Sequence, residues 1–300
     1  MNFRFPDYGV TAAVLVFACI APMRMAAQTN STQINRTNRT AAEALVKAAA
    51  AKPTPRLAGH PDLNGSWTYP QFDKSAHQDA EGNFYIAVPP ANGGATPRTD
   101  VAPAAQFERR PDPNMPPYKP ELLKKVNELA ADEVHSDPAF HCKPLGVPRA
   151  GPPAQIVQTP KLTVLFYQID AGIGDQPGGF RLVPTDGRKH RTDVDPSYFG
   201  DSIGHWEGDT LVVDVTHFND ETWLAGGDGG SGYFHTDALH VIERFTRKGD
   251  SLLWEATAMD PNVLTKPWVV APETEVLRED MIYEQPICEE RETSHFTDKY

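Results

Sequence analysis

The pattern of apolar and polar positions changes along the chain from helical spacing to strand alternation. Between Pro120 and Val134, apolar side chains recur every three or four residues, which predicts one amphipathic helix that packs on a sheet. From Ile156 onward, runs rich in β-branched and aromatic residues are separated by turn residues, a pattern typical of strands. Two of these stretches place a Gly-Asp pair, at Gly208 and Gly249, between an incoming and an outgoing strand. Each pair predicts a tight antiparallel hairpin.

Successive hairpins with short links favour a sheet whose strands run up and down in chain order. We therefore expect a mainly β fold, an antiparallel lipocalin-like barrel with one packed helix and long segments rich in Pro and Gly. A two-layer β-sandwich is the alternative. The spacing of the two Gly-Asp turns is close to the blade length of a β-propeller, but two copies cannot supply a ring of blades.

The N-terminal segment has the order of regions found in secretory signals. Arg4 precedes an apolar run from Val10 to Met23, and small residues follow before Gln28. The run is shorter than the ~20 apolar residues of a spanning helix, which predicts a cleaved signal peptide over residues 1–27. Residues 28–58 are expected to be a flexible segment, and residues 59–300 a single β-rich domain. This organisation predicts a periplasmic or secreted protein with no stable membrane insertion after signal removal.

Removal of the signal leaves two cysteines, Cys142 and Cys288. Cysteine pairs in exported proteins usually form disulfide bonds, so we expect these two to pair. A catalytic thiol is the alternative.

Composition excludes some classes of partner and enzyme. The formal net charge of -12, with Lys and Arg scattered along the chain, argues against a nucleic-acid partner. The sequence contains no GxSxG, Walker A or strand-to-helix GxGxxG motif, so it lacks the signatures of common serine hydrolases and nucleotide-binding enzymes. A small molecule is the expected partner.

Strand alternation groups the candidate catalytic residues. His240 and Arg244 share one face of a strand and are expected to point into one cavity, and Asp214 lies in the middle of another strand. Histidine beside a carboxylate or an arginine suits acid–base chemistry near neutral pH. The candidate catalytic residues are His205, Asp214, His240 and Arg244, with a surface histidine or a structural ion pair as the alternative reading.

Aromatic rings and one arginine provide the candidate ligand-binding residues, because rings lining a concave site hold flat or apolar ligands. These candidates are Arg181, Trp206, Trp223 and Tyr167. The glycine-rich segment that begins at Trp223 and ends at His235 is expected to be a mobile loop over the barrel mouth. No metal site is assigned, since HExxH is absent and His240 and Glu243 project to opposite faces; a bound metal ion is left open.

A series of motifs, among them HCKPLGVPRAGPP, FRLVPTDGRKH, GHWEGDTLVVD and HTDALHVIERF, resembles an uncharacterised family of exported bacterial proteins. The similarity spans roughly residues 62–295. It implies a bacterial periplasmic or secreted setting and one continuous domain, and it assigns no activity.

Two functions follow from these expectations. The first is an exported enzyme without an organic cofactor, of the lyase, isomerase or hydrolase type, acting on an aromatic, polyketide-like or glycosidic compound. In it a histidine would move a proton, Asp214 would orient or share it, and an arginine would stabilise negative charge. The alternative is a periplasmic carrier or binding protein for an apolar small ligand.

Overall fold

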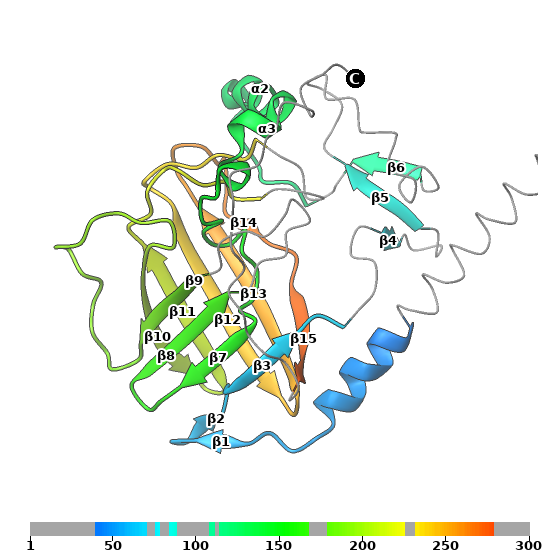
Figure 1. Ribbon diagram of the computed structural model, residues 1–300, viewed down its shortest axis with the longest axis vertical. Coiled ribbons are helices and arrows are strands. Elements are labelled where there is room, and N and C mark those ends of the chain that lie inside the picture. Colours follow the sequence, from blue (N-terminus) through cyan, green and yellow to red (C-terminus); the bar gives the residue numbers. More distant parts are fainter. Residues whose placement is uncertain are drawn as a thin grey trace, which may run out of the picture.

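The protein is mainly β, as seen in a computed structural model that describes residues 40–70, 76–78, 84–88, 108–111, 114–167, 179–225 and 232–278. Within these residues, nine antiparallel strands form one nearly closed, barrel-like sheet, and a short tenth strand, β14 (Trp268–Val269), pairs with β13 (Figure 1). The nine are β3 (Gly65–Thr68), β7 (Gln155–Gln158), β8 (Leu162–Tyr167), β9 (Gly179–Pro184), β10 (Asp201–Glu207), β11 (Thr210–Thr216), β12 (His240–Lys248), β13 (Ser251–Met259) and β15 (Glu273–Arg278). The predicted lipocalin-like barrel is confirmed.

The strands follow one another around the barrel in chain order. The sheet runs β10-β11-β12-β13-β15-β3-β7-β8-β9, and β15 pairs with β3, where Leu277 lies opposite Trp67. The two ends of this order, β10 and β9, lie side by side, and no backbone ladder joins them in the described part of the chain. We call this place the seam. Gly204 allows the close approach there, because a Cβ at this position would lie 2.8 Å from Cγ1 of Val183 on β9.

Both predicted Gly-Asp hairpins are present. The first joins β10 to β11 at Gly208, and the second joins β12 to β13 at Gly249. The two glycines have φ angles of +62° and +59°, in the left-handed region that glycine adopts without steric cost.

Side chains fill the barrel interior. On β11, Leu211, Val213 and Val215 point inward and are fully buried. Large rings from several strands meet the same core, among them Trp67, Tyr167, Phe245 and Trp254. The interior of the described barrel is therefore a packed hydrophobic core crossed by a few buried polar groups.

The helix predicted between Pro120 and Val134 forms in three pieces: the 3-10 turn η2 (Pro120–Leu122), α2 (Leu123–Ala131) and α3 (Glu133–Ser136). α2 and α3 lie at one end of the barrel (Figure 1), and Val126 of α2 belongs to the same hydrophobic core as the strand residues. Val126 is the buried residue of α2, and its carbonyl oxygen packs so closely on Gly232 that a Cβ there would clash. The helix is thus held against the segment at Gly232 as well as against the core.

Part of the segment expected to be flexible is docked on the barrel. Residues 40–50 form a helix, and the amide of Asp250 donates to the carbonyl of Ala49 at 3.0 Å. Lys52 then pairs with the Asp250 carboxylate at 2.6 Å, and the amide of Gly249 donates to Thr54 Oγ1 at 2.7 Å. Residues 49–54 therefore hold the turn of the β12–β13 hairpin, because backbone groups that this turn leaves unpaired find partners there.

Smaller elements complete the described chain. A two-stranded hairpin pairs β1 (Arg56–Leu57) with β2 (His60–Pro61). The segment rich in Pro and Gly before the helices contains a three-stranded sheet of β4 (Ala76–Gln78), β5 (Phe84–Val88) and β6 (Glu108–Pro111). A short 3-10 helix, η3 (Pro138–His141), precedes Cys142. Across the described residues, no helix combines the length and the apolar character needed to cross a bilayer.

Cys142 directly follows η3. Cys288 and residues 1–27 lie outside the described residues, so the Cys142–Cys288 pairing and the signal peptide stay predictions.

Candidate functional site

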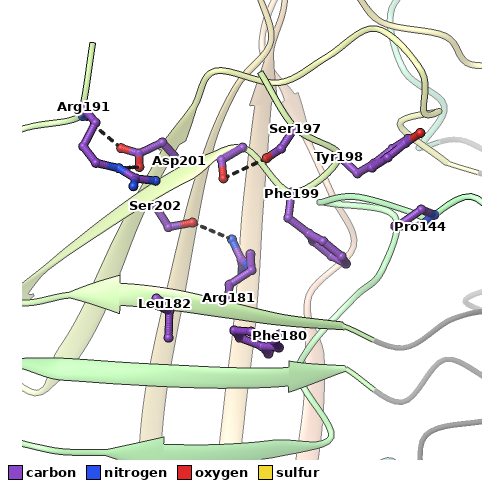
Figure 2. A pocket seen from close by; sticks show the side chains of 11 residues that line it. Pro144, Phe180, Arg181, Leu182, Arg191, Ser197, Tyr198, Phe199, Asp201 and Ser202 are labelled. Atoms are coloured by element: carbon purple, nitrogen blue, oxygen red, sulfur yellow. Dashed lines mark hydrogen bonds and ion pairs between the residues drawn. The ribbon is translucent and has the colours of Figure 1, made fainter. Parts of the chain in front are cut away.

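A pocket of about 290 Å³ opens on the seam between β9 and β10 (Figure 2). This volume is close to the lower end of the ~300–1,000 Å³ typical of small-molecule sites. Its wall combines aromatic and apolar side chains with two guanidinium groups, a carboxylate and hydroxyls. The lining residues are Pro144, Phe180, Arg181, Leu182, Arg191, Ser197, Tyr198, Phe199, Gly200, Asp201 and Ser202.

Arg181 joins the pocket to the polar centre of the barrel. Its Nη1 donates to Ser202 Oγ at 3.3 Å, its Nε donates to the Tyr167 hydroxyl at 3.0 Å, and its Nη2 lies 2.5 Å from Glu243 Oε2. Trp254 Nε1 donates to the other oxygen of Glu243 at 3.0 Å. Burial raises the pKa of the Tyr167 hydroxyl above its usual range, against the lowering effect of Arg181, so this hydroxyl stays protonated. Arg181 and Glu243 thus form an ion pair behind the pocket. The pair carries no net charge, and both of its side chains have further hydrogen-bond partners.

A second set of polar groups begins at the pocket wall and runs outward. Asp201 accepts from Arg191 Nε at 2.9 Å, and its Oδ2 lies 3.0 Å from His190 Nδ1. The other nitrogen of His190 lies 3.0 Å from Asp214 Oδ1, and the same oxygen lies 2.9 Å from Nε2 of His240. We call Asp201, His190, Asp214 and His240 the outer relay. Since an ionised carboxylate only accepts hydrogen bonds, a His190 ring with both nitrogens protonated satisfies both of its contacts.

The charge of Asp201 follows from its neighbours. Burial alone raises the pKa of this carboxyl, but hydrogen bonds from His190 and Arg191 outweigh burial and hold the pKa below its usual range. Asp201 is therefore a carboxylate at neutral pH. Arg191 reaches it through Nε, and no described residue hydrogen-bonds its Nη1 or Nη2, which lie on a side chain that is 59% exposed.

The candidate catalytic residues fall into two separate pairs, and only one pair is connected to the pocket. Asp214 and His240 meet in the outer relay. His205 and Arg244 lie elsewhere on the outer wall, where both contact Glu207, at 3.3 Å and 2.8 Å. Arg244, and to a smaller degree His205, holds the pKa of Glu207 below its usual range.

The expectation that His240 and Arg244 point into one cavity is wrong. Their strand neighbours Val241, Glu243 and Phe245 are the inward residues and are fully buried. Alternation therefore turns His240 and Arg244 to the outer wall of the barrel, and Asp214 faces outward in the same way. The outer relay is connected to the pocket through Asp201, which lines the pocket and contacts His190.

The candidate ligand-binding residues also divide. Arg181 lines the pocket, and Tyr167 lies directly behind it. Trp206 lies toward the other end of β10 and stacks on His60, with ring centroids 4.5 Å apart. Trp223 is buried beside the guanidinium of Arg149, 5.7 Å from the ring centroid, and does not line the pocket. Residues 226–231 of the predicted lid loop lie outside the described residues.

His190 and Asp201 are functional candidates that sequence reasoning missed. His190 lies in the irregular segment between β9 and β10, where no periodicity predicts which way a side chain points. Its contacts join residues 11 and 24 positions away. A nearby histidine, His217, has a φ of +60°, which breaks the alternation of β11 and places its ring 6.4 Å from that of His190. The motif FRLVPTDGRKH ends on His190, and this position in the motif is the signal in the sequence that could have marked the residue as a candidate.

Among the described residues, no three His, Cys, Asp or Glu side chains are arranged to hold a metal ion. Comparisons with known proteins found no matching family model, no similar curated protein and no similar solved structure.

Proposed function

We propose that the protein is an enzyme that moves a proton on a small molecule held in the seam pocket. The observation that supports this most directly is that Asp201 belongs both to the pocket wall and to the outer relay. A carboxylate in a partly enclosed site, held by a histidine and an arginine, is a common arrangement for acid–base catalysis. Isomerisations and eliminations that start by removing an acidic C–H proton use such a group, and those beside a carbonyl can proceed without an organic cofactor.

In the proposed reaction Asp201 acts as the base. A C–H bond of the substrate breaks, the proton forms an O–H bond with Asp201, and the electron pair becomes an enolate on a neighbouring carbonyl. Arg191, whose Nη1 and Nη2 have no hydrogen-bond partner among the described residues, stabilises that negative charge. Asp201 returns the proton to another atom in an isomerisation, or a leaving group departs in an elimination.

The low pKa of Asp201 is compatible with this role. A low pKa makes the free carboxylate a weak base, but an anionic substrate bound beside it disfavours its ionised form and strengthens it as a base in the complex. His190 is a positioning residue, since it holds Oδ2 of Asp201 and connects it to Asp214 and His240 at the surface.

A carrier protein is the second candidate, and the apolar part of the pocket favours it. Phe180, Leu182 and Phe199 line the pocket together with the polar groups. Because the barrel core is packed, a carried ligand would occupy the seam pocket rather than the lumen typical of lipocalins.

The test uses phenylpyruvate as a probe, because it combines an aromatic ring, a carboxylate and an acidic C–H next to a carbonyl. Proton NMR in D₂O follows the exchange of the benzylic protons with the full chain. We expect exchange well above the buffer rate, and Asp201→Asn should reduce it by about 10²–10⁴-fold while phenylpyruvate binding changes little. His190→Gln should reduce the rate and also move its pH profile, which a merely structural role would not do.

Asp209→Asn is the matched control, because Asp209 is an exposed carboxylate paired with Arg56 away from the pocket. It should exchange phenylpyruvate protons at the unmodified rate. Exchange at the buffer rate in the unmodified protein, or full activity of Asp201→Asn, rejects the catalytic proposal. Binding of phenylpyruvate without exchange favours the carrier.

We also infer that the protein acts outside the cytoplasm, after cleavage of residues 1–27 and with Cys142 paired to Cys288. The signal-like order of the N-terminal residues supports the export. Two cysteines in an exported chain usually pair, which supports the proposed disulfide.

A further inference from the structure

The outer face of β7, β8 and β9 is apolar where an exposed sheet face is normally polar. On β9, Phe180 and Leu182 point outward and are 62% and 52% exposed, and Val157 on β7 is 41% exposed. Antiparallel sheets that face water on one side usually alternate apolar residues inside with polar residues outside. These three strands carry apolar residues on both faces.

Strand register arranges the outward residues in two rows. Val157 on β7 lies opposite Val164 on β8, which lies opposite Leu182 on β9. Two pairs further along, on the same face, Phe166 lies opposite Phe180, with ring centroids 6.3 Å apart. We call Val157, Val164, Leu182, Phe166 and Phe180 the apolar strip.

The outer wall on the other side of the seam is different. There β11, β12 and β13 present Asp214, Arg244 and Glu255 among hydroxyl and aliphatic side chains, with Arg244 directly opposite Glu255. The apolar strip is thus local to β7–β9 and is not a general property of this barrel's surface.

The apolar strip runs into the seam pocket. Phe180 and Leu182 belong to both, and the pocket also contains the guanidinium groups of Arg181 and Arg191 (Figure 2). Arg181 is compensated by Glu243, whereas Nη1 and Nη2 of Arg191 have no hydrogen-bond partner among the described residues. One continuous surface therefore offers a cationic hydrogen-bond donor at one end and exposed apolar side chains at the other.

We propose that the site takes an amphiphilic carboxylate, whose head group binds Arg191 in the seam pocket and whose apolar chain lies along Leu182, Val164 and Val157. This inference deepens the proposed function and rests on the same pocket. It narrows the ligand class from small molecules in general to acids with an extended hydrocarbon or aryl-alkyl chain.

The test compares butanoate, hexanoate and octanoate, below their micelle concentrations, by calorimetry or NMR titration of the full chain. Each methylene that gains contact with the strip should tighten binding by about two- to fourfold, because the strip covers the chain from one side. Octanol, with the same chain and no carboxylate, should bind more weakly than octanoate.

Val157→Thr and Val164→Thr test the strip without touching the pocket, since neither residue lines it and threonine keeps the shape of valine. Both variants should flatten the dependence on chain length and leave butanoate binding unchanged. Ile242→Thr, on the outer wall of β12, is the matched control and should behave like the unmodified protein.

The outcomes separate this inference from the proposed function. Affinity that does not rise with chain length, or a rise that survives both strip variants, overturns the amphiphile proposal, while phenylpyruvate exchange still reports on Asp201. If light scattering shows dimers that Val164→Thr converts to monomers, the strip is an interface between two copies, and the proposal is also overturned. If the affinity rises with chain length but the protein does not catalyse exchange of the phenylpyruvate protons, the amphiphile site is supported and the catalytic proposal is rejected.

Discussion

Arg181 and Glu243 form an ion pair inside the barrel, with side chains that are 2% and 0% exposed. Moving two charges out of water is costly, and the cost is offset only when every polar atom finds a partner. Here Tyr167, Ser202 and Trp254 complete the hydrogen bonding. Residue identity therefore matters at each of these positions, because removal of one partner leaves the others buried and unsatisfied.

We expect Glu243→Gln to lower the free energy of unfolding by about 3–5 kcal/mol, because it leaves the Arg181 charge buried without compensation. Urea unfolding followed by tryptophan fluorescence measures this. Replacing both residues by methionine should recover only part of the loss, because an apolar pair avoids the desolvation cost but removes the hydrogen bonds to Ser202 and Trp254.

Glu207→Gln is the matched comparison. It removes the same carboxylate charge from the Arg244 contact, whose side chains are 51% and 39% exposed, and should cost only about 0–1 kcal/mol. Equal effects of Glu243→Gln and Glu207→Gln would contradict the argument that burial makes the loss of the Glu243 carboxylate costly.

At the scale of elements, local patterns predicted the strands well and their faces incompletely. The Gly-Asp turns and β-branched runs predicted both hairpins and the up-and-down order. On β11, however, Val212 is buried on the outer face, so both faces look apolar and the sequence does not show which one carries the core. The site residue His190 could not be placed, since its segment is irregular and its partners come from β10 and β11.

The seam is an element-scale feature that depends on Gly204. We expect Gly204→Ala to lower the free energy of unfolding by about 1–3 kcal/mol, because the added methyl group would lie 2.8 Å from Val183 Cγ1 and 3.0 Å from Thr185 Cγ2. Urea unfolding again provides the measurement. Ile203→Thr, the preceding position on β10 with an outward side chain, should cost less, and a larger loss there would contradict the packing argument.

At the scale of the whole molecule, stability depends on pH through groups whose pKa values differ between the folded and unfolded chain. The net charge of -12 shrinks as the pH falls toward the pI of about 5.3, which relieves repulsion and stabilises the fold. His235 acts in the opposite direction. Its Nδ1 faces the carbonyl of Thr236 at 3.0 Å and its Nε2 faces the Thr222 hydroxyl at 2.6 Å, an arrangement that suits a neutral ring.

Burial lowers the pKa of His235 in the folded chain, against smaller raising effects from Thr236 and Asp260. In the unfolded chain the pKa is close to ~6.5, so the unfolded state binds the proton first as the pH falls. The His235 contribution is therefore fully present above pH ~6.5 and is lost below it, at up to ~1.4 kcal/mol per pH unit. Because hydrogen bonds from His190 and Arg191 hold the pKa of Asp201 below the usual range of an aspartate, this carboxylate stays ionised throughout the window. We expect urea unfolding at pH 7.5 and 5.5 to show that His235→Gln loses less stability on acidification than the unmodified protein, and equal losses in the two proteins would contradict the assignment of a buried neutral ring.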